Sequence, residues 1–442
     1  MGIFLDGFDF FIIAVALPLI NEVFNPAPWE LGLVASAALL GAIVGALGIG
    51  KLTDIVGRRA VYVVDLGLFV VFSVFSAASW SVWALIIARF GLGIAVGADY
   101  PISAAFVSEI MPKRVRGRFL VGAFSFQAAG AIFGAISALV ILLIYPEPQA
   151  WRWMLLLGVI PAIVIVFQRR RVPESPRWLL HNGQPEKAAE IVSLLVGKKV
   201  SVKKAKKLAA QPFAKSVKLL QAKYRRRTLL VSIPWFLQDI ATYGVGIFTP
   251  TIIGALAISS DDQRVFIAKA TTKAEGTIVV DIALVIGFVV AIVFIERIGR
   301  MKMQINGFVW MTVGLVVLAA SSYFGDGSAP ATALVFVGFI VFNFFMNFGP
   351  NSTTYVLPVE LYPTKIRATA HGFAASTAKV GAAIGAFLFP VIQAELGIAV
   401  TLYIVAAASV AGAVVTYLFR IEPMGRSLSS VEDSGAFPVS PG

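Results

Sequence analysis

The segment Glu109-Ile-Met-Pro-Lys-Arg-Val-Arg116 has a counterpart in the second half of the chain, Glu360-Leu-Tyr-Pro-Thr-Lys-Ile-Arg367, with Glu, Pro and Arg in register. A second pair is Gly50-Lys-Leu-Thr-Asp-Ile-Val-Gly-Arg-Arg59 and Glu296-Arg-Ile-Gly-Arg300. All four segments follow long apolar runs. Equivalent connections of this kind indicate one helical unit that occurs twice, in the same orientation, around a central cavity. A channel could also contain repeats, but no carbonyl-lined filter loop is visible in the sequence.

The composition is that of an integral membrane protein. Of 442 residues, 58% are apolar and only 14% are charged, and the mean hydropathy is +0.85. An ordinary soluble domain is about 45–50% apolar and about 25% charged. The chain therefore has too few polar residues to coat soluble domains, so lipid must surround most of its surface.

Apolar runs of about 20 residues predict twelve membrane-spanning helices. They cover residues 3–24, 30–51, 60–79, 82–108, 119–144, 152–170, 228–257, 274–297, 303–323, 331–357, 366–392 and 397–420. We expect an N-terminal six-helix half (1–170), a basic cytoplasmic loop (171–226), a C-terminal six-helix half (227–421) and a cytoplasmic tail (422–442).

Positive charge is unevenly distributed. The net charge is +13, and residues 168–227 alone hold 17 Lys/Arg against three acids. Connections after even-numbered spans, with the tail, hold 31 of the 37 Lys/Arg, against four on the opposite side. This bias places both termini and the basic loop in the cytoplasm of a multi-pass plasma-membrane protein. Nucleic acid is not needed to account for the charge, and we expect a monomer in the bilayer.

Several kinds of chemistry have no support in the sequence. The chain has no cysteine, and its two histidines, His181 and His371, lie too far apart for a metal-ligand spacing. No nucleophile–base set and no phosphate-cradling loop is present. We therefore expect neither an enzyme nor an ATP-driven pump, and no cofactor or metal. A secondary transporter is the remaining class.

Ionisable residues within the predicted spans are candidates for function, since a charge in hydrocarbon is costly. Asp6 and Asp9 share a face of the first span, and Arg89 lies ten residues before Asp99 on the fourth. A carboxyl that is paired when charged can load and release a proton as access alternates. The alternatives are a fixed structural salt bridge and, for Asp6, a place at the cytoplasmic interface. Asp65 and Asp281 also fall within spans, without an assigned role.

Two further features indicate a site within the membrane: an aromatic stripe, which alone would more often be packing but has an acid at its centre, and a buried lysine, which points to an anionic substrate. Trp235, Asp239 and Tyr243 stand at i, i+4 and i+8, so they form one stripe on the seventh span. Lys379 lies on the apolar eleventh span, where it requires an anionic partner. We expect that partner to be Asp239 in the empty protein and the substrate in the loaded one. Snorkelling of Lys379 to the interface is the alternative.

A set of charged residues at the cytoplasmic ends of spans predicts a gate. Ion pairs among them would hold the two halves together when the cavity opens outward, and would break on rocking. Topology-setting charge and helix capping are alternative roles for these residues. The set comprises Asp54, Arg58, Arg59, Glu109, Arg116, Glu296, Arg300, Glu360 and Arg367.

Several segments resemble the major facilitator superfamily. Gly50–Arg59 resembles its signature between the second and third spans, and Pro173–Leu179 and Glu422–Leu428 resemble elements of its sugar-porter group. Within that group the chain is most similar to the phosphate:proton symporter family. The segments that carry this similarity are Gly97-Ala-Asp-Tyr-Pro-Ile-Ser103, Trp235-Phe-Leu-Gln-Asp-Ile-Ala-Thr-Tyr243, Asn347-Phe-Gly-Pro-Asn-Ser-Thr-Thr354, and His371-Gly372 with Lys379-Val-Gly381.

The resemblance implies an all-α membrane protein with the major facilitator fold. It also implies that an acid of the first span neighbours Arg89, and that Tyr100, Gln127 and an asparagine of the tenth span join the stripe around the substrate. The expected substrate-binding residues are Tyr100, Gln127, Trp235, Asp239, Tyr243, Asn347, Asn351 and Lys379. The expected proton-coupling residues are Asp6, Asp9, Arg89, Asp99 and Asp239.

The expected function is proton-coupled symport of an anion, most simply inorganic phosphate. A protonated Asp239 can donate a hydrogen bond to the anion, whereas an ionised one repels it, so the proton must arrive with or before phosphate. Asp6-Gly-Phe-Asp9 also resembles the opening of aromatic-acid:proton symporters, which leaves organic acids as an alternative. A sugar porter should carry a Gln-Gln pair where this chain has Gln238-Asp239, so sugar is disfavoured.

Overall fold

The structure is a computed structural model that describes residues 2–56, 58–97, 116–169, 179, 183–196, 201–202, 219–258, 266–363 and 366–424. Within these ranges every regular element is a helix, which confirms the predicted all-α class. The helices of the first half are α1 (Gly2–Phe24), α2 (Pro28–Val56), α3 (Arg58–Ala77), α4 (Val82–Gly97), α6 (Arg116–Phe124), α7 (Phe126–Ile144), α8 (Ala150–Leu157) and α9 (Val159–Arg169).

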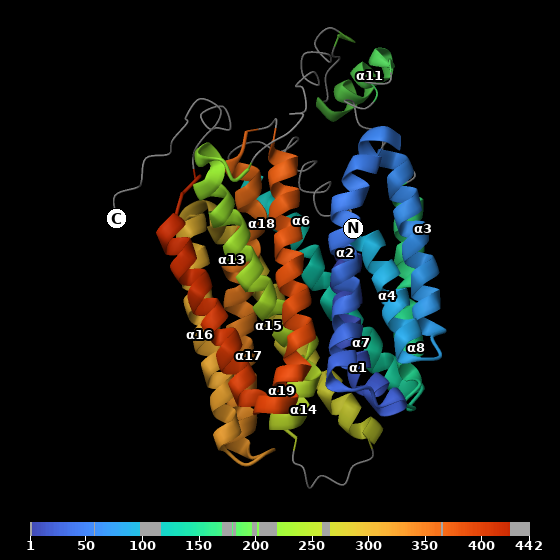
Figure 1. The fold of residues 1–442 in the computed structure, drawn as a ribbon, viewed down its shortest axis with the longest axis vertical. Coiled ribbons are helices and arrows are strands. Elements are labelled where there is room, and N and C mark those ends of the chain that lie inside the picture. Colours follow the sequence, from blue (N-terminus) through green and yellow to red (C-terminus); the bar gives the residue numbers. More distant parts are fainter. Residues whose placement is uncertain are drawn as a thin grey trace.

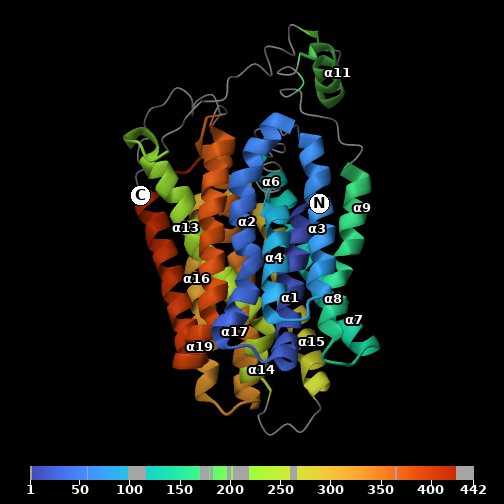
Figure 2. The same cartoon turned by 45° about the vertical axis from the view of Figure 1, so that its right-hand side comes forward.

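The basic loop contains α11 (Pro185–Val196), which lies beyond one end of the bundle (Figure 1). The elements of the second half are α13 (Ala222–Ile247), α14 (Thr249–Leu256), α15 (Phe266–Ile298), α16 (Arg300–Ala320), η1 (Ser321–Tyr323), α17 (Ala329–Phe348), α18 (Pro350–Leu361) and α19 (Arg367–Phe419). Figures 1 and 2 show the helices of the first and second halves gathered side by side.

The helices correspond to the twelve predicted spans. In the described part, eight helices are long and apolar enough to cross a membrane, or nine with the bent pair α13–α14. The helix α19 holds two predicted spans, since Gly397 interrupts it with a φ of 80°. The third and fourth spans correspond to the shorter apolar segments Val64–Ala77 and Val82–Gly97. The fourth was predicted to reach residue 108, and its end lies outside the described residues.

Two predicted spans differ from the structure. The seventh, predicted as one helix, is bent by 58° between Ile247 and Thr249. Pro250 accounts for the bend, because proline has no N–H to donate and its ring clashes with the carbonyl four residues earlier. The eighth begins at Phe266 rather than at residue 274. Its first two turns contain Lys269, Thr271 and Thr272, with Lys273 directly after, so a search for apolar runs misses them.

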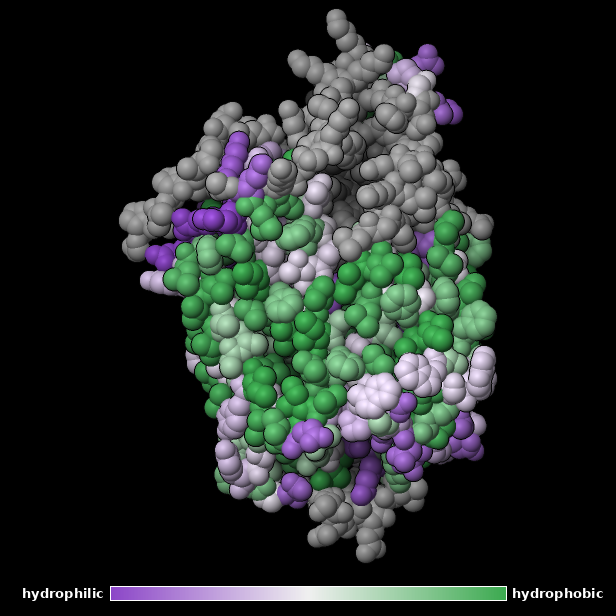
Figure 3. Space-filling model, viewed as in Figure 1, coloured by the Kyte–Doolittle hydropathy of each residue, from purple (hydrophilic) through white to green (hydrophobic). Residues whose placement is uncertain are grey.

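Apolar side chains cover the outside of the bundle. Figure 3 shows a broad hydrophobic band across the middle of one face, with hydrophilic residues toward its ends. Large side chains such as Phe75, Ile87 and Leu143 are more than half exposed. This exposure would be costly in water, so it agrees with a surface that faces lipid.

Glycines allow the helices that carry the candidate site to lie very close together. A Cβ on Gly7 of α1 would overlap the backbone of Gln127 on α7. In the second half, a Cβ on Gly385 of α19 would overlap the carbonyl oxygen of Ile240 on α13. Small residues at such contacts are typical of membrane helix packing. The close approach fixes α7 beside α1 and α19 beside α13, which are the helices that bear most of the candidate residues.

The most extensive contacts between the two halves run along two seams. In one seam α2 packs on α19, where Gly32 lies against the backbone of Phe387. In the other, α15 packs on α6 and α7, where the ring of Phe288 meets that of Phe124 edge-on at 5.9 Å. The site described below lies between these seams. The domain boundaries predicted from the sequence stay predictions.

Candidate functional site

Asp9 and Arg89 form a buried ion pair between α1 and α4. The guanidinium donates two hydrogen bonds to the carboxylate, from Nη2 to Oδ2 at 3.0 Å and from Nη1 to Oδ1 at 3.1 Å. Asp9 is 4% exposed and Arg89 is fully buried. Parallel hydrogen bonds of this kind are the strongest geometry available to such a pair. The structure thus places an acid of the first span beside Arg89, as the resemblance implied.

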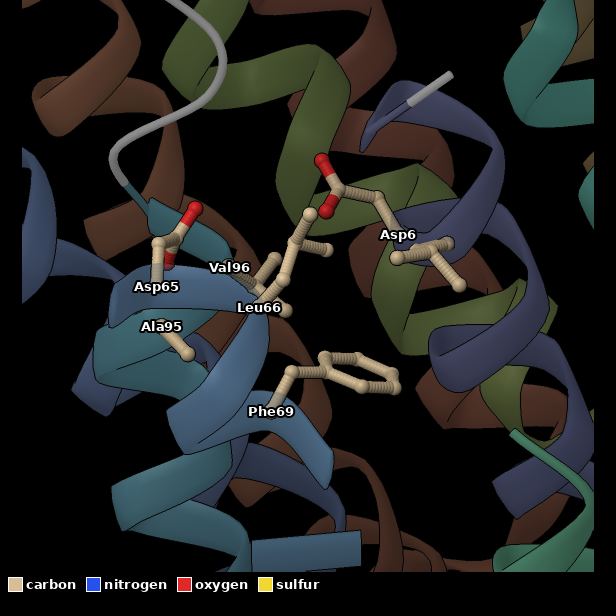
Figure 4. Close-up of a pocket in the computed structure, with 7 residues that line it drawn as sticks. Asp6, Asp65, Leu66, Phe69, Ala95 and Val96 are labelled. Atoms are coloured by element: carbon tan, nitrogen blue, oxygen red, sulfur yellow. The ribbon is translucent and has the colours of Figure 1, made fainter. Parts of the chain in front are cut away.

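Asp6 is buried in the first half, and its place relative to the membrane interface stays a prediction. It faces a small cavity between α1, α3 and α4, and Asp65 of α3 lies on the same cavity (Figure 4). Both aspartates are buried, while Leu66, Phe69 and Val96 form much of the apolar wall. Two carboxyls in one apolar cavity cannot both ionise without mutual repulsion. Asp65 had no assigned role in the sequence. The structure places it, with Asp6, among the buried acids of the first half.

Lys379 meets the stripe of the seventh span. Its Nζ lies 2.7 Å from the hydroxyl oxygen of Tyr243 and 3.9 Å from Oδ2 of Asp239. The ammonium also lies 4.4 Å from the ring centre of Tyr243 and 5.3 Å from that of Phe10. Trp235 and Asp239 are both buried one helical turn apart on α13, so Lys379 contacts Tyr243 and Asp239 of the stripe. The expected contact between Lys379 and Asp239 is present, and snorkelling is excluded by burial.

Gln127 connects this group to the first half. Its Nε2 donates to the hydroxyl oxygen of Tyr243 at 3.1 Å, from α7 to α13. Phe10 of α1 packs edge-on against the Tyr243 ring at 5.3 Å. Tyr243 therefore accepts hydrogen bonds from both halves at one oxygen. The residues Gln127, Tyr243 and Lys379 form a polar centre between the halves.

The two expected asparagines line up beside this centre. Asn351 donates from Nδ2 to Oδ1 of Asn347 at 2.7 Å, and Gln238 donates to Oδ1 of Asn351 at 3.3 Å. Asn347 in turn donates to the carbonyl of Asn343 at 2.7 Å. The break between α17 and α18 at Gly349 lies within this row. The asparagines thus reach the stripe through Gln238, the neighbour of Asp239.

Part of the predicted gate forms one charged cluster. Arg300 binds Glu296 through two hydrogen bonds of 2.8 and 3.0 Å and Glu360 through two of 2.8 and 2.7 Å. Glu296 Oε1 also accepts the backbone N–H of Gly117, on α6 of the first half, at 3.1 Å. In the described residues the ion pairs of this cluster lie within the second half. The contact across the halves is made by a backbone amide.

Other predicted residues lie elsewhere. Arg367 donates to the carbonyl of Tyr362 at 3.4 Å. Tyr100, Asp99 and Glu109 lie outside the described residues. The side chains of four more gate residues also lie outside them: Asp54, Arg58, Arg59 and Arg116. Their roles stay predictions.

The N-terminal end of α13 is anchored to the segment that follows α18. Arg227 donates to the carbonyl of Leu361 at 3.1 Å, and the hydroxyls of Thr228 and Tyr362 lie 2.7 Å apart. Burial raises the pKa of Tyr362 to about 12, so its hydroxyl stays neutral at physiological pH. This anchor fixes the start of the helix that carries the stripe.

Sequence reasoning missed three contributors. Phe10 is an ordinary apolar residue in the sequence, and only its place opposite Lys379 distinguishes it. Glu422 accepts the backbone N–H groups of Arg300 and Met301 at 3.2 and 2.9 Å, so it caps α16 beside the gate cluster. His371 packs edge-on against Trp235 and Tyr355, with ring centres 5.6 and 5.2 Å away. In the sequence, only the family-like segments that contain Glu422 and His371 indicated that these two residues matter.

Comparison with known proteins places the chain in a family. Residues 1–434 match the family model described as "Sugar (and other) transporter". The chain belongs to this family. A "Probable inorganic phosphate transporter 1-6" of Arabidopsis thaliana is 32% identical over 98% of this chain and 91% of its own length. "Inorganic phosphate transporter 1-2" of Oryza sativa subsp. japonica is 32% identical over 88% of this chain and 81% of its own.

Solved structures support the same fold. The proton:xylose symporter XylE, described as a major facilitator superfamily protein, covers 98% of this transporter with a TM-score of 0.78 and 22% identity, over 96% of its own chain. A partially occluded inward-open form of XylE from E. coli also has a TM-score of 0.78, at 21% identity, covering 95% of this chain and 97% of its own. The transporter thus has the predicted major facilitator fold with twelve spans.

Proposed function

We propose that this transporter is a proton-coupled symporter that moves inorganic phosphate by alternating access. The observation that carries the proposal is Lys379, a buried ammonium beside Tyr243 and Asp239 between the two halves. A buried cation with neutral hydrogen-bond donors around it suits a small oxyanion. The names of the relatives that align over most of the chain support phosphate in particular.

The donors of the site can surround phosphate oxygens. Tyr243, Trp235 and Gln127 each offer an N–H or O–H group, and Lys379 supplies the positive charge. Asp239 is the remaining member, and as a carboxylate it would repel the anion. Protonation turns Asp239 into a further donor, so anion and proton assist each other's binding. By linkage this effect is reciprocal.

Asp9 and Arg89 supply a second proton-dependent element. In their present geometry the ion pair is closed, with both side chains buried. Protonation of Asp9 would remove the charge that holds Arg89 and would release α4 from α1. We assign proton coupling to this pair together with Asp6, Asp99 and Asp239, and the cytoplasmic gate to the Arg300 cluster and its partners.

We propose that the transporter lies in the plasma membrane with both termini in the cytoplasm. The excess of Lys and Arg on one side supports this orientation. The basic loop and the Arg300 cluster then lie on the cytoplasmic side. We propose that the protein acts as a monomer, without catalysis, and that its partners are the anion, protons and lipid.

Uptake into proteoliposomes tests the proposal. Purified protein is reconstituted, an inside-alkaline pH gradient is imposed, and labelled phosphate, benzoate and glucose are offered separately. We expect accumulation of phosphate that collapses when a protonophore removes the gradient. Accumulation of benzoate instead would favour an organic-acid symporter, which the Asp6-Gly-Phe-Asp9 segment permits. Accumulation of glucose alone would contradict the anion site.

A further inference from the structure

Asp281 is a buried acid at the centre of α15 that the proposed function does not use. It is the sixteenth residue of a 33-residue helix, so about 22 Å of helix precedes it and about 25 Å follows it. The residue is 2% exposed. Aspartate is too short to reach either interface from this depth, so its carboxyl stays within the membrane region of the protein.

The carboxyl has no counter-ion in the part of the chain that the structure describes. Its Oδ2 has no hydrogen-bond partner, and no salt bridge to a described Lys or Arg is present. Asp9, by contrast, binds Arg89, and Asp239 has Lys379 at 3.9 Å. An unpaired carboxylate out of water costs several kcal/mol, whereas the neutral acid costs far less. In this state the carboxyl is therefore protonated.

The position of Asp281 on the helix connects it to the motion between the halves. Phe288, Ile292 and Glu296 stand 7, 11 and 15 residues further along α15, which places all of them on the same face. Phe288 packs on Phe124, Ile292 lies beside Gly122, and Glu296 accepts the N–H of Gly117, all on α6. Asp281 therefore faces the first half, at the seam where α15 meets α7.

Other charged groups near this seam face elsewhere. No charged residue occurs on α7, α14 or α17, which pack against α15. On α1, Asp9 and Asp6 face α4 and α3. The remaining charged residues on α15 and on the neighbouring α1, α6 and α16 are Glu22, Arg116, Arg118, Lys269, Lys273, Glu275, Glu296, Arg297, Arg300 and Lys302. Glu275, the nearest of those on α15 in sequence, precedes Asp281 by six residues and has an exposed side chain.

We propose that Asp281 is a proton-binding site of the second half, which is loaded when the α7–α15 seam is closed and exchanges its proton when rocking of the halves opens that seam to water. The ligand is the proton alone, and Asp281 does not contact phosphate. The inference rests on the proposed proton-coupled uptake. It adds one proton to each transport cycle, beyond those that the acids of the first half and Asp239 carry.

The slope of accumulation against the pH gradient tests this inference. With the membrane potential clamped at zero, the steady-state phosphate ratio reports how many protons move with each anion. Asp281→Asn keeps the size and polarity of the neutral acid but cannot release a proton. We expect its accumulation to fall about tenfold relative to the parent at a gradient of one pH unit, while phosphate exchange without a gradient continues. Glu275→Gln, on the exposed side of the same helix, is the matched control and should keep the parental slope.

Each outcome decides between the alternatives. Exchange by Asp281→Asn with the parental slope would overturn the role of Asp281 and leave phosphate symport intact. A parent protein that neither exchanges nor accumulates phosphate would defeat the proposed function itself. Because asparagine matches a protonated aspartate, the variant should also melt at the parental temperature. Failure of Asp281→Asn to fold would mean that the acid is ionised and structurally paired, which contradicts the inference.

Discussion

Replacement of Lys379 by Gln tests the charge of the substrate. In the empty protein the ammonium is held by Tyr243 at 2.7 Å and lies 3.9 Å from Asp239. Glutamine keeps a donor of similar length but carries no charge. A hydrogen bond to a charged group contributes about 1.5–3 kcal/mol in a buried site. The variant should therefore bind phosphate roughly 10- to 150-fold more weakly.

The same variant should bind phosphate with a weaker dependence on pH. In the parent, affinity should rise as the pH falls, because a proton on Asp239 removes its repulsion of the anion. Without the Lys379 ammonium, an ionised Asp239 has no counter-ion, so it should hold its proton throughout the range. The affinity of Lys379→Gln should then change little between about pH 5 and about pH 8.

The assay is calorimetric titration of purified protein with phosphate across this pH range. Lys302→Gln is the control, since Lys302 is an exposed cation on α16 and its loss changes the net charge equally. Equal affinities and equal pH slopes for the parent and Lys379→Gln would refute the anion argument and return neutral sugars to consideration.

Three further predictions test the coupling, the topology and the packing. Asp9→Asn should abolish gradient-driven accumulation while exchange of phosphate persists, since asparagine cannot titrate; accumulation that still follows the gradient would remove Asp9 from its role. In sealed right-side-out vesicles, a protease added outside should not cut within residues 198–207. Cleavage there would contradict the predicted topology. Gly385→Ala should lower the melting temperature by several degrees, because its Cβ would overlap the Ile240 carbonyl, whereas Gly372→Ala on the same helix meets open space. Equal melting of the two variants would mean that the helices adjust.

The fold was largely predictable because the bilayer demands a strong pattern. Apolar runs of about 20 residues are uncommon outside membrane-spanning helices, and the repeated segments around Pro112 and Pro363 predicted two related halves. The internal breaks were harder to predict. The bend at Pro250 depends on local backbone chemistry, and the early start at Phe266 depends on helical turns interrupted by lysine and threonine; a search for apolar runs detects neither.

The candidate site was predictable only where chemistry made a residue conspicuous. Asp239 and Lys379 stood out because charge is rare in such spans, and the structure places them together. Phe10 did not stand out, since an aromatic residue in an apolar helix is ordinary. Asp281 stood out, but a single residue cannot indicate which neighbour it faces. Which neighbour Asp281 faces is decided by how the helices pack. In the sequence, only glycines far along the chain indicate that packing.

The hydroxyl of Tyr243 accepts hydrogen bonds from Gln127 on α7 and from Lys379 on α19, so a single oxygen joins three helices and both halves. An anion that binds the Lys379 ammonium must weaken the hydrogen bond between Lys379 and Tyr243, which is part of this junction. Part of the attraction between substrate and protein is then used to free the halves for movement, and it does not appear as affinity. A carrier built in this way should bind its substrate only moderately and release it quickly. This junction therefore favours rapid turnover over tight binding of the substrate.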